Sequence, residues 1–206
     1  MLAPVVICLY TGLNPVSAND FDCQPQQSSF VMKNICSSAF EESRQHFHNQ
    51  SLTAFLITDA PIQLLQDTHK TWYQRVKKCK SKDCLVQQFD FRVDQLNFFT
   101  SMNQSMTQHY LKYESGQLAT SSVHLQIHQL SKNNLKIEGS AYRNPNNKLE
   151  TQMIPFLAYS TSQDKHQITN NESDCKYDFD FQKSILKIST LDKNCERFSG
   201  VYRLYD

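Results

Sequence analysis

The first eighteen residues of this 206-residue chain carry no charged side chain. Val5 to Tyr10 form a short apolar run, and Val16-Ser17-Ala18 supplies the small residues of a cleavage site. This pattern predicts a secretory signal peptide over residues 1–18, cleaved after Ala18. The basic residues that usually precede such a run are absent, which leaves open a start further upstream. A buried strand or helix is the alternative interpretation. A signal peptide places the mature chain in the periplasm or outside the cell.

Long apolar runs and an excess of charge are also missing. No segment after the leader is long enough to span a bilayer. The formal net charge is only +1, so no overall field draws the chain to nucleic acid or to a membrane surface. Glycine and proline are scarce, at 4 and 6 residues, and no repeat is evident. The composition suits an ordinary soluble protein of one or two small domains.

Catalytic motifs are missing as well. The chain has no H-E-x-x-H, G-x-S-x-G or P-loop sequence. Two S-x-x-K matches, Ser162–Lys165 and Ser184–Lys187, lack the partner motifs that this chemistry requires. We therefore expect a protein that is not an enzyme and that needs no cofactor and no metal.

Cysteine is present in an even number once the leader is removed. Cleavage after Ala18 removes Cys8 and leaves six cysteines, and an even count in an exported chain indicates disulfides. Their spacing favours local pairs, since each cysteine has one near neighbour in sequence and the pairs lie far apart. The predicted disulfides are Cys23–Cys36, Cys79–Cys84 and Cys175–Cys195.

The first half of the mature chain has the period of helices. Leu65, His69, Trp72 and Val76 follow one face of a helix. We expect Asp59 as its N-cap and Pro61 in its first turn. A second helix follows the basic stretch. Its expected buried stripe is Val86, Phe89, Val93 and Leu96.

From about Val123 the period changes to two. Val123, Leu125 and Ile127 alternate with polar residues, and further short alternating segments continue to a closing strand that ends at Tyr205. The sequence thus predicts an α+β protein. A disulfide-stapled helical bundle or hairpin over residues 19–115 precedes an antiparallel β-sandwich or small barrel over 120–206.

The stretch from Arg75 to Cys84, RVKKCKSKDC, allows several interpretations. Its cysteines could form half of a zinc site, but the only nearby histidine pair, His46 and His48, would point about 200° apart on a helix. A redox site favours C-x-x-C within a βαβ unit, which is absent here. The remaining interpretation is a disulfide that joins two helices, with Cys79 at the end of the first helix and Cys84 at the start of the second.

Basic residues crowd the same stretch, because the segment from Lys70 to Lys82 holds six Lys or Arg and no Asp or Glu. One interpretation is a solvated helix end, where Lys77 and Lys78 complement the helix dipole. The other is a contact with an acidic partner. Lys77, Lys78, Lys80 and Lys82 are then the candidate binding residues, and the partner is a protein rather than nucleic acid, since interleaved aromatics are lacking.

Three further side chains suggest chemistry but have structural explanations. We expect Trp72 in the core and His69 as a buried, hydrogen-bonded histidine. His124 and His128 stand two steps apart on the polar side of a strand. They could bind a metal, but exposure to solvent is the simpler expectation.

The order of these residues resembles a known family. Phe21-Asp22-Cys23, Ile35-Cys36-Ser37, Trp72, Cys79 and Cys84-Leu85 are similar to the LprI-type lysozyme-inhibitor domain of exported bacterial proteins, over about residues 20–99. That pattern runs F-D-C, I-C-S, Q-x-x-W and R-x-x-C. This chain departs from it at Phe40–Ser43, at His69 in the Gln position and at Val76 in the Arg position.

The resemblance implies a helical domain and a function. An inhibitor of this kind would dock in the cleft of a lysozyme, whose catalytic groups are paired carboxylates, and Lys80 or Lys82 would meet them. The alternative is a periplasmic immunity protein or chaperone for a secreted toxin or hydrolase. The strand-rich half lies outside the resemblance.

Overall fold

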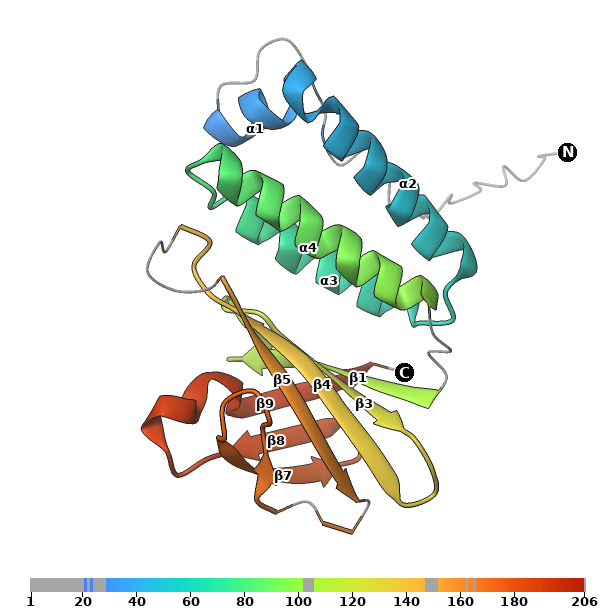
Figure 1. Ribbon diagram of the computed structural model, residues 1–206, viewed down its shortest axis with the longest axis vertical. Coiled ribbons are helices and arrows are strands. Elements are labelled where there is room, and N and C mark those ends of the chain that lie inside the picture. The colour runs from blue at the N-terminus through green and yellow to red at the C-terminus, as the bar shows by residue number, and fades with distance from the viewer. Residues whose placement is uncertain are drawn as a thin grey trace, which may run out of the picture.

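A computed structural model of the chain describes residues 21, 23, 29–101, 106–146, 152–161, 163, 164 and 166–205. The predicted signal peptide, residues 1–18, lies outside this set, and so does Cys8. Helices precede strands along the chain, and the two kinds of element form separate layers (Figure 1). The predicted α+β class is confirmed.

The helical layer is built on an antiparallel hairpin. Its elements are α1 (Phe30–Ile35), the 3-10 turn η1 (Ser38–Phe40), α2 (Glu41–Ile57), α3 (Ile62–Val76) and α4 (Lys82–Ser101). Helix α3 starts later than expected, with Pro61 rather than Asp59 at the N-cap position. Ser29 accepts from Met32 N at the start of α1, and Pro61 precedes α3.

Helix α4 differs from the expected stripe, because it lies between α2 and the sheet and is covered on two sides (Figure 1). Phe89, Val93 and Leu96 are buried as predicted, but Val86 is 42 % exposed and Leu85 takes its place in the core. A helix with two covered faces has no single apolar stripe.

The aromatic core of the helical layer surrounds Trp72. Its ring stacks on Phe47 at 4.7 Å between centroids, and its indole N–H donates to the Gln88 carbonyl at 2.6 Å. Phe21 adds its ring beside Trp72 and Phe89. The expectation that Trp72 belongs to the core is confirmed.

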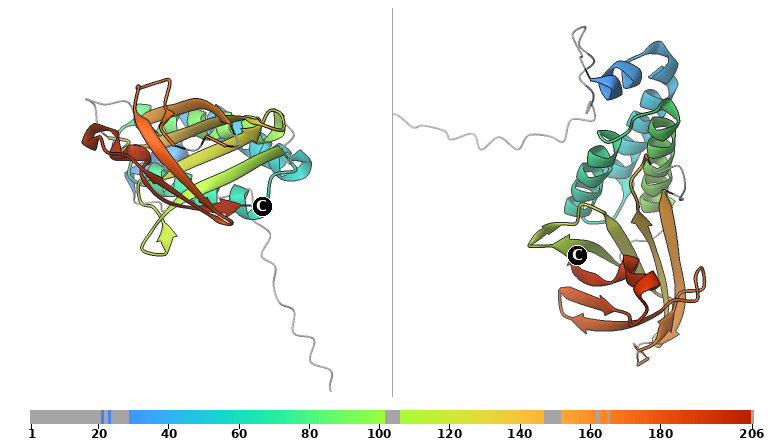
Figure 2. Two further views of the ribbon diagram at one scale, coloured as in Figure 1. Left: turned by 90° about the horizontal axis from the view of Figure 1, so that it is seen from below. Right: turned by 90° about the vertical axis from the view of Figure 1, so that its left-hand side faces the viewer.

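The second half of the chain forms an antiparallel sheet that nearly closes into a barrel (Figure 2). The strand order is β5-β4-β3-β1-β9-β8-β7-β6, with β2 paired to β1. The strands are β1 (Thr107–Glu114), β2 (Gln117–Leu118), β3 (Val123–Gln129), β4 (Asn134–Tyr142), β5 (Met153–Thr161), β6 (Ile168–Thr169), β7 (Lys176–Gln182), β8 (Ile185–Ser189) and β9 (Gly200–Tyr205). A 3-10 turn, η3 (Lys193–Phe198), precedes β9.

Side-chain and backbone contacts bridge the remaining gap between β5 and the segment after β6. Leu157 N donates to the buried Asn170 Oδ1 at 3.0 Å, and Asn171 N donates to the Leu157 carbonyl at 2.8 Å. These two bonds satisfy polar groups that a free sheet edge would leave open. The alternative of a small barrel, rather than a sandwich, is therefore the one that the structure supports.

The strands begin earlier than the sequence suggested. We expected the helical domain to reach residue 115, yet β1 covers Thr107–Glu114 and lies inside the sheet between β3 and β9. Ser115 and Gly116, at the expected end of the helical domain, form the tip of the β1–β2 hairpin. Both residues have positive φ, at 51° and 78°, as a tight two-residue turn requires.

All three predicted disulfides are present. Cys23 joins Cys36, Cys79 joins Cys84 between α3 and α4, and Cys175 joins Cys195 between the start of β7 and η3. Such bonds are typical of exported proteins. In the residues that the structure covers, each helix is too short or too polar to cross a bilayer.

Candidate partner-binding site

The candidate lysines lie on the turn that joins α3 to α4. Lys77 and Lys78 follow the last residue of α3, Lys80 lies in the turn, and Lys82 opens α4. All four side chains are exposed to solvent. The structure thus brings the predicted binding residues together on one corner of the helical layer.

Bonds from two directions fix the backbone of this turn. The Cys79–Cys84 disulfide closes it from within. From the β4–β5 connection, Asn146 accepts from Lys80 N at 2.8 Å and donates to the Lys78 carbonyl. Since these contacts use only the backbone of Lys78 and Lys80, the ammonium groups remain at the surface.

One basic residue of the stretch leaves the surface. Arg75 is 5 % exposed and lies at the boundary between the helices and the barrel. It donates to Gln88 Oε1 at 3.1 Å and to Ser122 Oγ at 2.6 Å, and its guanidinium lies 3.6 Å from the centre of the Tyr142 ring. Burial lowers the pKa of Arg75. The exposed basic set is therefore Lys70 and the four lysines of the turn.

A groove of about 630 Å³ adjoins the turn. One wall is the face of α3 and the residues just beyond it, from Asp67 to Lys78, and the other is the β1–β2 hairpin, from Tyr113 to Thr120. Arg203 of β9 also lines it. At one side of the groove, Tyr205 Oη donates to Asp67 Oδ2 at 2.7 Å and lies 2.9 Å from Tyr113 Oη.

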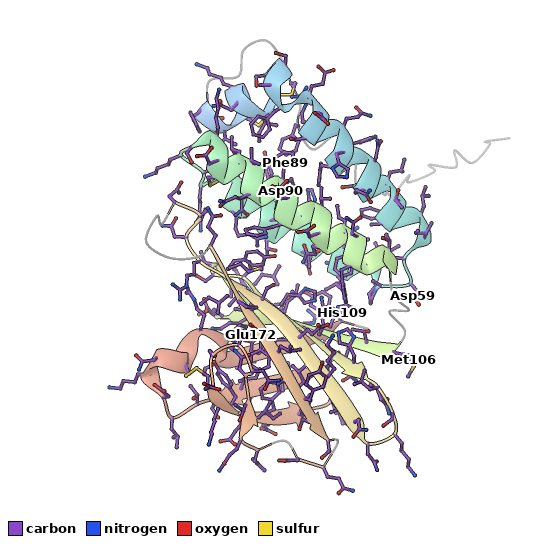
Figure 3. All side chains as sticks on the ribbon, in the orientation of Figure 1. Asp59, Phe89, Asp90, Met106, His109 and Glu172 are labelled. Atoms are coloured by element: carbon purple, nitrogen blue, oxygen red, sulfur yellow. A yellow bond between two sulfur atoms is a disulfide. The ribbon has the colours of Figure 1, made fainter. Side chains whose placement is uncertain are left out.

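The expected exposure of His124 and His128 is wrong. His124 is 4 % exposed and His128 is 5 % exposed, and His109 of β1 is fully buried beside them. Figure 3 shows His109 between the helices and the sheet. The polar side of β3 carries these histidines because it faces α4 rather than solvent, so both sides of this strand are covered.

Short contacts connect the buried histidines. His109 Nδ1 lies 3.2 Å from His124 Nε2, so one ring donates and the other accepts. His128 Nδ1 lies 3.0 Å from Thr107 Oγ1, and its Nε2 lies 3.0 Å from a carboxylate oxygen of Glu138. The Phe99 ring packs on the first pair, at 5.8 Å from His109 and 6.2 Å from His124.

The environment of these histidines favours their neutral form. Burial lowers the pKa of His109 to about 4, with a smaller contribution from His128, while Asp59 acts in the opposite direction. Burial also holds the pKa of His124 well below its usual range, assisted by His109 and Arg92. Burial lowers the pKa of His128 despite the opposing effect of Glu138.

Within the described parts of the chain, no group of three or more His, Cys, Asp or Glu side chains is arranged to hold a metal ion. His69, expected to be buried, is half-buried instead, with its ring packed on Phe47 and Trp72.

Sequence reasoning missed two residues of this region, Lys70 and Arg203, as members of the groove. Lys70 was part of the counted basic stretch, but nothing near it in sequence indicated a cavity. Arg203 lies far away in the chain and comes beside α3 only through the pairing of β9 with β1. The one available signal was its outward position in the closing strand, next to the inward Tyr202.

The arrangement presents positive charge at the surface of the protein. It combines exposed ammonium groups on a fixed turn with a charged groove beside them. Comparison with known proteins adds no relative, since no family model, curated protein or solved structure matches the chain. The resemblance to the LprI-type domain therefore stays a prediction.

Proposed function

We propose that this protein is an exported bacterial binding protein without enzymatic activity. It attaches to an acidic surface of a protein partner through Lys77, Lys78, Lys80 and Lys82. The observation that carries the proposal is the fixed basic turn, in which exposed lysines stand on a backbone held by Cys79–Cys84 and by Asn146. Three disulfides support export of the chain.

A fixed turn favours binding for a physical reason. Association costs free energy when a loop must be ordered, and a turn that is already ordered avoids that cost. Positive groups on such a turn also accelerate the encounter with a negative surface, and salt weakens that attraction. We therefore expect association that depends on ionic strength.

The specific partner that we propose is a lysozyme. The cleft of such an enzyme carries paired carboxylates, which complement the exposed ammonium groups of Lys80 and Lys82. The motifs that resemble the LprI-type domain support this choice. The protein would act by rigid docking that blocks the cleft.

The test measures lysis of peptidoglycan by c-, g- and i-type lysozymes with and without the protein. We expect one class to be slowed at micromolar protein and the slowing to be lost in Lys80→Glu plus Lys82→Glu. The matched control is Lys132→Glu plus Lys193→Glu, which makes the same charge change at exposed positions of the barrel half. If no class is slowed at micromolar protein, the lysozyme proposal is wrong.

A second candidate is an immunity protein or chaperone for a secreted toxin or hydrolase. Exposed apolar side chains at the end of α2 and the start of α3 favour it, since Leu56, Ile57 and Ile62 are 73 %, 64 % and 61 % exposed. Co-expression with an exported effector encoded beside the gene tests this role. A complex that survives Lys80→Glu plus Lys82→Glu but is lost in Leu56→Asp plus Ile62→Asp would support it.

A further inference from the structure

The groove beside the basic turn has its own charge pattern. Lys70, Lys78 and Arg203 contribute three cations to its lining, against the single carboxylate of Asp67. None of the three cations forms an ion pair among the residues that the structure covers. Asp67 is already engaged, because it accepts a hydrogen bond from Tyr205. The groove therefore presents net positive charge in the part of the chain that the structure describes.

The position of Arg203 follows from the sheet. Side chains alternate along β9, so the buried Tyr202 points into the barrel while Arg203 and Tyr205 point to the other face. Tyr205 belongs to the core of the helical layer, which shows that this face meets α3. Arg203 thus lies on the face of the sheet that meets α3, and it lines the same groove as Lys70 of α3 and Lys78 of the turn.

The spacing of the cations selects the kind of ligand. Lys70 and Lys78 are eight residues apart along α3 and the turn after it, which is roughly 12 Å at about 1.5 Å per residue. A single phosphate or carboxylate meets both only when the two lysine side chains extend toward each other along the groove, whereas a longer anionic ligand meets each of them separately. An extended peptide covers about 13 Å in four residues and places alternate side chains on one side. The groove volume of about 630 Å³ is of the size that holds a ligand of this kind.

We propose that this groove binds an extended acidic peptide segment, with one carboxylate paired to the Arg203 guanidinium and others meeting Lys70 and Lys78. Arginine suits this role because its planar group donates two parallel hydrogen bonds to a carboxylate. The inference rests on the proposed function, since the segment belongs to the acidic partner that the basic turn recognises. Lys78 belongs to both surfaces, so the positive surface continues from the turn into the groove.

The experiment uses the purified protein and a labelled seven-residue peptide, blocked at both ends, in which glutamate alternates with glycine. Fluorescence anisotropy at low ionic strength reports binding. We expect the glutamate peptide to bind and a glutamine version to bind at least tenfold more weakly. Lys70→Gln plus Arg203→Gln should weaken binding of the glutamate peptide at least tenfold. Lys132→Gln plus Lys193→Gln should leave it unchanged.

Several outcomes would overturn the inference. Equal affinity for the two peptides would show that the carboxylates are not recognised. An unchanged affinity in Lys70→Gln plus Arg203→Gln would show that the groove is not the binding site. Displacement of the peptide by an equal concentration of inorganic phosphate indicates a point-anion site instead. A short single-stranded oligonucleotide that binds as tightly as the peptide indicates a polyanion surface without preference for protein.

The result is separable from that of the lysozyme test. The groove variants leave all four lysines of the turn in place. Peptide binding without any inhibition of lysozymes would support the inference about the groove and contradict the lysozyme proposal. Inhibition of a lysozyme without peptide binding would support the proposed function and contradict the inference about the groove. Thermal unfolding of each variant checks that the fold is intact.

Discussion

At the scale of single residues, Arg75 connects three elements. It extends from α3 to Gln88 of α4, to Ser122 before β3 and to the ring of Tyr142 in β4. A planar guanidinium makes these contacts together because it donates in several directions while its face stacks on the ring. A lysine keeps the charge but offers one compact ammonium group.

We therefore expect Arg75→Lys to lower the free energy of unfolding by about 1–3 kcal/mol, the cost of leaving a buried polar group unsatisfied. Urea unfolding followed by tryptophan fluorescence measures it, since Trp72 is buried in the same layer. Lys70→Arg, at an exposed position of the same helix, is the control. An unchanged midpoint for Arg75→Lys would contradict this account of the interface.

Gly139 is required by close packing between strands β3 and β4. A Cβ atom at this position would lie 2.3 Å from Leu125 Cδ2 and 2.7 Å from the His124 carbonyl oxygen. The carbonyl belongs to the backbone and cannot rotate away, so the strands must separate. We expect Gly139→Ala to destabilise the protein by about 1–3 kcal/mol, as overpacking typically does.

Thermal or urea unfolding of Gly139→Ala measures that loss. Ser140→Ala, on the opposite face of the same strand, serves as the control and should change stability by less than about 0.5 kcal/mol. Equal stability of the two variants would show that the strands accommodate the added methyl group.

At the scale of elements, the disulfides differ in the length of chain they close. Cys175–Cys195 spans 20 residues and Cys79–Cys84 spans 5. The chain-entropy relation gives about 3 kcal/mol for the first and about 2 kcal/mol for the second. The short bond therefore matters more for the geometry of the turn than for overall stability.

We expect Cys79→Ser plus Cys84→Ser to weaken partner binding more than Cys175→Ser plus Cys195→Ser does. The second pair of substitutions should lower the free energy of unfolding more than the first. Urea unfolding and the lysis assay, applied to both double variants, give the two quantities. The ranking fails if loss of the short bond lowers the free energy of unfolding more than loss of the long one.

The elements also differ in how clearly their sequences predict them. The α3 stripe, with Leu65, Trp72 and Val76, was predictable because one of its faces carries the apolar side chains that the core requires. Strand β1 was not, since its Gln-His-Tyr-Leu-Lys-Tyr sequence shows no clear alternation. Tyr110 faces the barrel interior while His109 and Leu111 face the helices, so both sides are buried.

At the scale of the whole molecule, the two layers meet on titratable side chains. Three histidines face α4 from the sheet: His109, His124 and His128. Burial lowers the pKa of each histidine, and Arg92 adds to that effect at His124, while Asp59 opposes it at His109 and Glu138 opposes it at His128. Their folded-state pKa values are lowered, so between about pH 6.5 and 4 the unfolded chain binds more protons than the folded one. Stability should therefore be full above about pH 6.5 and should fall as the pH drops toward 4.

A shift of the His109 pKa from 6.5 to about 4 corresponds to a loss on the order of 3 kcal/mol across that window. Urea unfolding at half-unit pH steps measures the slope. His109→Gln should give a shallower dependence on pH than the unmodified protein, which separates this histidine from the carboxylates. Equal slopes in the two proteins would contradict the assignment.

The sequence by itself determined the order of the classes of structure, the three local disulfides, the burial of Trp72 on its helical stripe and the exposure of the lysines at the α3–α4 turn. These features depend on residues close together in the chain, where spacing and period carry the information. Only the tertiary structure decided that α4 covers the polar side of β3, that Arg75 and the histidines are buried, and that Arg203 and Lys70 line one groove. The physical reason is that burial of a polar face depends on which distant element packs against it, and a polar residue paired in an interface has the same local sequence pattern as one exposed to water.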